Sequence, residues 1–357
     1  MLWVRVYPAL PIKSFVSSRL SPKARAKAIA VTLLGLQSLL LRILENNLQN
    51  NDLSSELEYK ENVNALYTQF GSKINKFSYL LGVRYEDSRI EINQLTSNIY
   101  KTKKYHNFFP SAFLTYEISG NSSVSVNYSK RITRPRDRFI NPFASYTSNI
   151  NLFQGNPDIN PALSDAYDLG YLKKWDKVTL STSVYFNHTT NSFQVVRKER
   201  GDKINGIPVI LNTPFNLATD DKLGFEFTLN YAFKKWWKIN GNFNFFNNKT
   251  TGEYSYINTS NNLVVQNFDF NSNTWFTRIT SKITLPYKIE WQTNATYNAP
   301  QKYGQGVMKA IFGANIAFSK DVLKDMGTLS FNVSDVFNSR KRRQDLELPR
   351  VNSNSEM

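Results

Sequence analysis

From Tyr59 onward, apolar and polar positions alternate along the chain in a long series of segments. The clearest row runs from Phe225 to Phe233, where every second residue is aromatic or aliphatic, while Glu226 and Thr228 lie between them. Successive side chains of a strand point to opposite faces, so this period of two predicts strands with one apolar and one polar face. The same pattern recurs at 77–85, 112–118, 124–128, 178–186, 279–285, 289–297 and 329–333. No helical periodicity interrupts these rows, so the sequence predicts an all-β chain.

The length and the polar face of these strands favour a membrane-spanning barrel over a soluble sandwich. A tilted spanning strand needs about 9–11 residues, whereas ordinary strands average about 5–6. The polar face carries charged residues at mid-strand, such as Arg84, Glu226 and Arg278. A dry sandwich core would exclude these groups, but a water-filled lumen accepts them. We therefore predict an antiparallel transmembrane β-barrel.

Short and long connections alternate along the chain, as in outer-membrane barrels, which have short periplasmic turns and longer extracellular loops. The short connections are predicted at 119–121, 174–177, 234–237 and 285–288. The long polar stretches are predicted at 90–104, 133–162, 191–220, 250–262 and 300–307. Aromatic residues gather near strand ends, as expected of interfacial girdles. This spacing predicts about fourteen strands.

Composition excludes several classes of function. The chain has no cysteine and two histidines, His106 and His188, so an imidazole- or thiolate-based catalytic or zinc site has few ligands available. The formal net charge is +16, but the basic residues are spread over strands and turns, and no nucleic-acid-binding module is present. No P-loop, nucleophile elbow or dinucleotide fingerprint occurs. We predict no catalytic residues, no cofactor, no metal and no nucleic-acid partner.

The two ends differ from the central part. Residues 1–46 are basic, with an apolar run at 28–44 that is too short and too often interrupted for a spanning helix. A mis-started reading frame and a signal-like region are both open for this segment. The barrel portion is predicted at 47–345, and 346–357 reads as a C-terminal tail.

Five ordered motifs carry a family resemblance. Tyr128–Phe143 contains Arg131-Ile-Thr-Arg134-Pro and ends in Asn141-Pro142-Phe143; Gly155-Asn156-Pro157 and Tyr167–Tyr171 follow. Phe109–Tyr116 precedes them, and Asn332–Asn338 lies near the end. In this order they resemble the barrel of TonB-dependent receptors, specifically the outer-membrane β-barrel family of the Bacteroidetes type.

The resemblance implies a location in the outer membrane of a Gram-negative bacterium and a barrel of the 22-stranded type, filled by an N-terminal plug. It also implies contacts with outer-membrane lipid, the plug domain and the TonB complex, and uptake of a large or scarce solute whose identity stays unknown. No segment here reads as a plug or TonB box, so the expectation is an incomplete, C-terminal barrel fragment. A passive porin-like or structural barrel, and a soluble β-sandwich carbohydrate-binding module, are the alternatives.

Two groups of candidate site residues follow from these motifs. Arg131, Arg134, Arg136 and Arg138 form a basic cluster at a strand end, either facing the lumen, plug or an anionic substrate, or pairing with acids such as Asp137. Asn141, Pro142, Phe143, Gly155, Asn156 and Pro157 form a loop motif whose turn-forming residues favour a role in loop shape over ligand binding.

Overall fold

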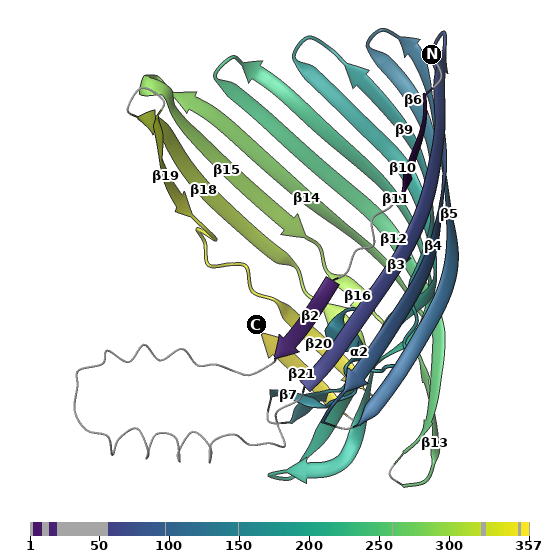
Figure 1. Cartoon of the computed structure of the whole chain (residues 1–357). Coiled ribbons are helices and arrows are strands. Elements are labelled where there is room, and N and C mark those ends of the chain that lie inside the picture. The colour runs from purple at the N-terminus through teal and green to yellow at the C-terminus, as the bar shows by residue number, and fades with distance from the viewer. Residues whose placement is uncertain are drawn as a thin grey trace, which may run out of the picture.

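The computed structural model describes residues 3–8, 14–19, 56–96, 98–148, 150–258, 260–322, 326–348 and 351–356 (Figure 1). Most of these residues lie in one large curved antiparallel sheet. Its strands are β1 (Trp3–Pro8), β2 (Ser14–Arg19), β3 (Glu56–Ile74), β4 (Phe77–Gln94), β5 (Ile99–Ser119), β6 (Ser122–Thr133), β7 (Ser145–Ser148), β8 (Asn151–Phe153), β9 (Ala162–Lys174), β10 (Val178–Ile204), β11 (Ile207–Lys234), β12 (Trp237–Ile257), β13 (Leu263–Asn267), β14 (Phe270–Leu285), β15 (Ile289–Asn298), β18 (Ile311–Val322) and β19 (Gly327–Val333).

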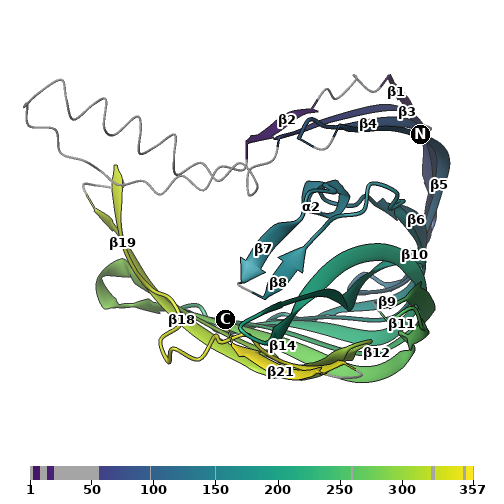
Figure 2. The same ribbon diagram turned by 90° about the horizontal axis from the view of Figure 1, so that it is seen from below.

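The long strands β3–β6, β9–β12, β14, β15, β18 and β19 pair with their neighbours in that order. β1 and β2 pair with two parts of β3. Among the described strands β19 pairs with β18 and β2 pairs with β3, and no register joins β19 to β2 or β3, so the sheet curves around a concave side without closing (Figure 2). The predicted all-β membrane-barrel class is confirmed, and these twelve long strands lie within two of the predicted number.

The connections at one end of the sheet are short, as predicted, but the predicted long loops contain strands. The stretch at 133–162 holds β7 and β8, the stretch at 300–307 holds two short strands, β16 (Gln301–Tyr303) and β17 (Gly306–Met308), and the other three form long hairpins. β4 and β5 pair as far as Gln94 and Ile99, and β10 and β11 pair as far as Ile204 and Ile207. β12 continues to Ile257 and pairs there with β13. The prediction was wrong because the apolar residues of these extensions form rows too short to give a clear period of two, although some, such as Ile90 and Ile92 of β4, are buried. The residues that alternate with them, such as Arg89 and Glu91, are charged. The hairpins therefore project beyond the apolar part of the sheet.

The convex face of the sheet carries cross-strand pairs of apolar residues. In β10 and β11 these pairs include Val184 with Phe225 and Phe186 with Leu223. Phe225 is 41% and Leu223 is 54% exposed, and the predicted row from Phe225 to Phe233 is not packed against a second sheet. A large apolar surface of this kind matches the lipid-facing band of a membrane barrel.

The connection between β6 and β9 folds to the concave side of the sheet (Figure 2). We call residues 134–161 the inserted segment; it contains α2 (Asp137–Ile140), β7 and β8. Ile140 and Ile159 from this segment form a buried cluster with Leu57, Ile90 and Ile92 of β3 and β4. The predicted long loop at 133–162 is therefore an ordered, packed element.

A second, smaller sheet contains β16 (Gln301–Tyr303), β17 (Gly306–Met308), β20 (Arg343–Leu348) and β21 (Val351–Glu356). The predicted tail at 346–357 thus contributes to a hairpin of this sheet. The predicted segment 1–46 is described only at β1 and β2, and its apolar run at 28–44 lies outside the described residues. Among the described residues there is no helix long and apolar enough to cross a membrane.

Candidate functional site

Arg134 fastens the start of the inserted segment to the concave wall. Its guanidinium forms ion pairs with Glu61 of β3 at 2.8 Å and with Glu86 of β4 at 2.7 Å, and it donates a hydrogen bond to Ser88 Oγ at 3.2 Å. Only 8% of the Glu86 side chain is exposed. Burial and the neighbouring Glu61 carboxylate raise the pKa of Tyr59, whose hydroxyl donates to Glu61 at 3.1 Å. One arginine therefore links three elements across a partly buried network.

The two halves of the predicted loop motif lie against each other. The Gly155 amide donates to the Asn141 carbonyl at 2.8 Å, and the Asn156 amide donates to the Phe139 carbonyl at 2.7 Å. A Cβ on Gly155 would lie 2.5 Å from the Asn141 oxygen, so only glycine permits this approach. The Asn141 side chain accepts from the Phe143 amide at 3.0 Å and shapes the turn around Pro142. These contacts hold the inserted segment in one conformation.

The far side of the inserted segment binds to β10 and β11. β8 pairs in parallel with Ile210–Asn212 of β11. The Asn216 side chain accepts from the Asn160 amide at 2.6 Å and donates to the Asn160 carbonyl at 2.8 Å. It also donates to the Asn191 carbonyl at 2.7 Å. The inserted segment therefore bridges the concave faces of β3–β5 and β10–β11. It narrows the space on the concave side of the sheet at the end where the long hairpins lie.

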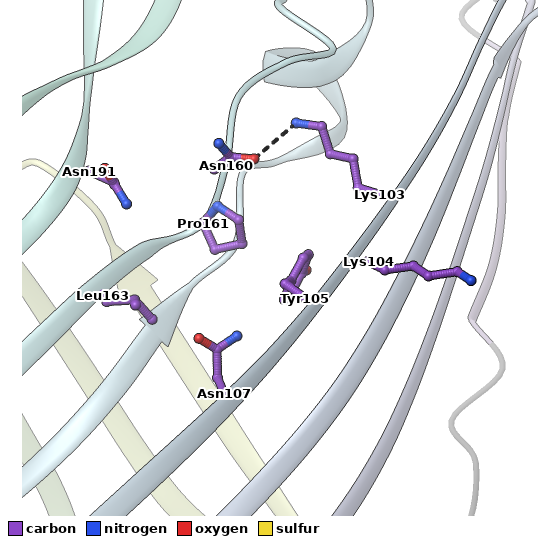
Figure 3. A pocket seen from close by; sticks show the side chains of 8 residues that line it. All are labelled: Lys103, Lys104, Tyr105, Asn107, Asn160, Pro161, Leu163 and Asn191. Atoms are coloured by element: carbon purple, nitrogen blue, oxygen red, sulfur yellow. Dashed lines mark hydrogen bonds between the residues drawn. The ribbon is translucent and has the colours of Figure 1, made fainter.

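β5 contributes two lysines to the same bridge. Lys101 forms an ion pair with Asp158. Lys103 donates to the Ile159 carbonyl at 2.6 Å and to Asn160 Oδ1 at 3.4 Å (Figure 3). Burial lowers the pKa of Lys103 to about 8, although Asp158 acts in the opposite direction. The ammonium thus sits in a partly desolvated position at the edge of a pocket.

That pocket, which we call the mouth pocket, has a volume of about 340 Å³ and lies between the inserted segment and the concave wall (Figure 3). Its lining combines three amides, one aromatic ring, one ammonium and two apolar side chains: Lys103, Tyr105, Asn107, Asn160, Pro161, Leu163 and Asn191. Lys104 borders the same region, but its side chain points away from the others (Figure 3). The mouth pocket can offer several hydrogen bonds to one polar solute.

A second pocket, which we call the wall pocket, has a volume of about 490 Å³ and lies on the concave face of β5, β6 and β9–β12. Glu226 accepts from Asn242 at 2.8 Å and from Asn244 at 3.2 Å. The Tyr185 hydroxyl donates to Asn244 Oδ1 at 2.9 Å, and Asn127 donates to Asp168 at 2.9 Å. The concave wall is therefore a polar surface on which Glu226 and Asp168 accept hydrogen bonds from amide side chains.

The four predicted arginines do not act together. Arg134 is in the network described above, whereas Arg131 donates only to Ser129 at 3.0 Å along its own strand. Arg138 lies over the Phe153 ring, 4.2 Å from its centroid, and Arg136 is exposed at the start of α2. Asp137, named as a partner, accepts from the Arg138 amide, and Arg134 instead pairs with two strand acids. In the described residues no group of three His, Asp or Glu side chains is placed to hold a metal.

Sequence reasoning missed Lys103, Asn107, Asn160 and Asn191. Lys103 and Asn107 fall on the inward face by alternation with Tyr105, which was a usable signal. Asn191 adopts a positive φ of 55° next to a register shift in β10, a backbone feature that alternation does not reveal.

The comparisons with known proteins agree with the fold. A family model described as "Outer membrane protein beta-barrel family" matches residues 38–357. No curated protein matches the chain.

Among solved structures, the siderophore receptor PiuA from Acinetobacter baumannii superposes with a TM-score of 0.56 at 13% identity, covering 84% of this chain and 42% of that one. The siderophore receptor PirA from Pseudomonas aeruginosa gives 0.53 at 12% identity, covering 81% and 55%. The ferric yersiniabactin uptake receptor FyuA from Yersinia pestis gives 0.52 at 14% identity, covering 85% and 45%. The chain therefore spans about half the length of these receptors.

Proposed function

Because the chain belongs to the outer membrane protein beta-barrel family, we propose that it forms part of the barrel of a TonB-dependent receptor that takes up a large or scarce solute. Its location is the outer membrane of a Gram-negative bacterium. The similar solved structures are receptors for siderophores or ferric siderophores, and their likeness to this chain concerns the fold. Siderophores are therefore the first class of solute to test.

The inserted segment is the observation that carries this proposal. It is fastened on one side by Arg134, Lys101 and Lys103, and on the other side by Asn216. A fixed element across the mouth restricts free diffusion and offers a place to hold a solute, in the mouth pocket. The mouth pocket that this element forms supports a receptor that holds a solute.

The concave wall supports the second part of the proposal, a plug and the TonB complex as partners. Amides and hydroxyls dominate this wall, and acids such as Glu226 and Asp168 already have amide partners. Such a surface can form many hydrogen bonds with a folded domain without leaving unpaired charges behind. We infer a transport role without catalysis, because the fold is that of uptake receptors.

Whole-cell uptake tests the proposal. Cells carrying the gene and cells lacking it are given ferric hydroxamate and ferric catecholate complexes labelled in the iron, with and without a protonophore. Gene-dependent uptake that stops when the proton-motive force is dissipated supports an energised receptor. Gene-dependent entry that is unaffected by the protonophore supports a passive pore and contradicts the proposal.

A further inference from the structure

The register of the sheet defines the height of the lipid-facing band. In β4 and β5 the apolar pairs on the convex face run from Phe77–Tyr116 to Tyr85–Phe108, which is five pairs. Alternate residues on one face are about 6.8 Å apart, so these pairs span about 27 Å along the strand. A tilt of about 40° reduces this to about 21 Å across the membrane, close to the apolar band of about 25 Å in such barrels.

The next pair beyond this band is polar in four of the strand pairings around the convex face. Asp87 lies opposite His106, Lys130 opposite Asp165, His188 opposite Asp221 and Asn247 opposite Asn273. Both histidines of the chain therefore occupy the same level, each beside an aspartate, at 3.1 Å for His106 and 2.6 Å for His188. Residues at this level, which we call the collar, lie where lipid headgroups begin.

The collar lies at the long-hairpin end, which in outer-membrane barrels faces the outside. The headgroups in contact with it are therefore those of the outer leaflet. Aromatic pairs lie directly below the collar, such as Tyr85–Phe108 and Tyr128–Tyr167. This is the position expected of an aromatic girdle at the membrane interface.

One pair next to the collar is electrostatically unfavourable. Arg89 of β4 lies directly opposite Lys104 of β5, one pair further out than His106. Like charges in directly opposite positions destabilise a sheet. Arg89 pairs with Glu91 at 2.9 Å, but within the described part of the chain Lys104 has no ion pair. Lys104 is exposed and points away from the mouth pocket (Figure 3), and an anion at this position would relieve the repulsion.

We propose that Arg89, Lys104 and His106 bind a phosphoryl group of an outer-leaflet lipid headgroup. The guanidinium and the ammonium supply charge-assisted donors, which suit phosphate oxygens. The contacts of His106 with Asp87 and with the Tyr85 hydroxyl both involve Nδ1, at 3.1 Å each, so Nε2 is directed to the open side of the ring. Asp87 and Glu91 position the imidazole and the guanidinium through their ion pairs. The apolar pairs below hold its acyl chains.

Lipid binding by the purified full chain tests this site. The chain is inserted into phosphatidylcholine vesicles that contain a bisphosphorylated lipid A, or the same lipid with its phosphates removed, and bound lipid A is measured after detergent extraction by mass spectrometry. At about 1 kcal/mol for each basic residue near a charged surface, Arg89→Gln with Lys104→Gln weakens binding of the phosphorylated lipid by about 30-fold. The matched control, Arg200→Gln with Lys203→Gln, removes the same charge from the tip of the β10–β11 hairpin and leaves binding unchanged.

Three results overturn the proposal. The first is equal binding of the phosphorylated and dephosphorylated lipids. The second is equal loss in the test and control variants. The third is complete loss of bound lipid A when inorganic phosphate alone is added. That result would assign a free anion to the site instead of a lipid. If the double variant does not insert, the single variant Lys104→Gln, which removes an exposed side chain, gives the same comparison. None of these results depends on solute uptake, so the proposed function is tested separately.

Discussion

Replacement of Arg134 by glutamine should loosen the inserted segment. The change removes ion pairs to Glu61 and Glu86, whose side chains are 19% and 8% exposed. Glu61 then has no ion pair among the described residues, and Glu86 keeps only Arg84 at 3.1 Å. Breaking a buried pair costs about 3–5 kcal/mol, and partial exposure here reduces the expected loss to about 2–4 kcal/mol. In a double-mutant cycle with Glu86→Gln, the coupling energy should be about 1–3 kcal/mol.

Two assays report this loss. Urea unfolding in lipid vesicles gives the free energy of unfolding, and limited trypsin digestion reports cleavage at Arg136 and Arg138 of the inserted segment. Arg131→Gln is the matched control, because the Arg131 guanidinium has no ion pair among the described residues and donates to Ser129 on its own strand, and it should stay within about 0.5 kcal/mol of the unmodified chain. If Arg134→Gln unfolds and is cleaved like the control, the network does not hold the segment and the reasoning fails.

Three further predictions follow from other parts of the structure. Gly155→Ala should destabilise the inserted segment by about 1–3 kcal/mol through backbone clashes, seen as faster proteolysis, whereas Gly120→Ala, with open space around it, should have no such effect. Val184→Arg on the convex face should cost about 2–4 kcal/mol of stability in lipid, while Ser183→Arg on the concave face is tolerated; equal losses would contradict the assignment of faces. Burial lowers the pKa of Lys103 to about 8, so the unfolded chain binds more protons than the folded chain above that pH. The free energy of unfolding of the unmodified chain should therefore rise between pH 8 and 10 relative to that of Lys103→Met. A difference that stays constant over this range would refute the prediction.

The sequence by itself determined the fold class and the faces of the strands. The row from Phe225 to Phe233 is exposed on the convex face, because a period of two admits only one assignment of sides. The motif residues Asn141 and Gly155 indicated an ordered loop, and they lie in contact. Alternation failed at 191–220, where buried apolar residues such as Val196, Val209 and Ile210 do not follow a regular period of two and register shifts interrupt the pairing of β10 with β11.

Only the tertiary structure decided which residues meet across the sheet. The partners of Arg134 are Glu61 and Glu86, which lie 73 and 48 positions away and come close through strand register and the inward fold of the inserted segment. Adjacent Asp137 was the nearer acid in sequence, yet its side chain binds the Arg138 amide. Local pattern fixes the side to which a residue points, because that depends on its own backbone; the pairing of distant charges depends on how many residues separate the strands and on where the connection between them folds.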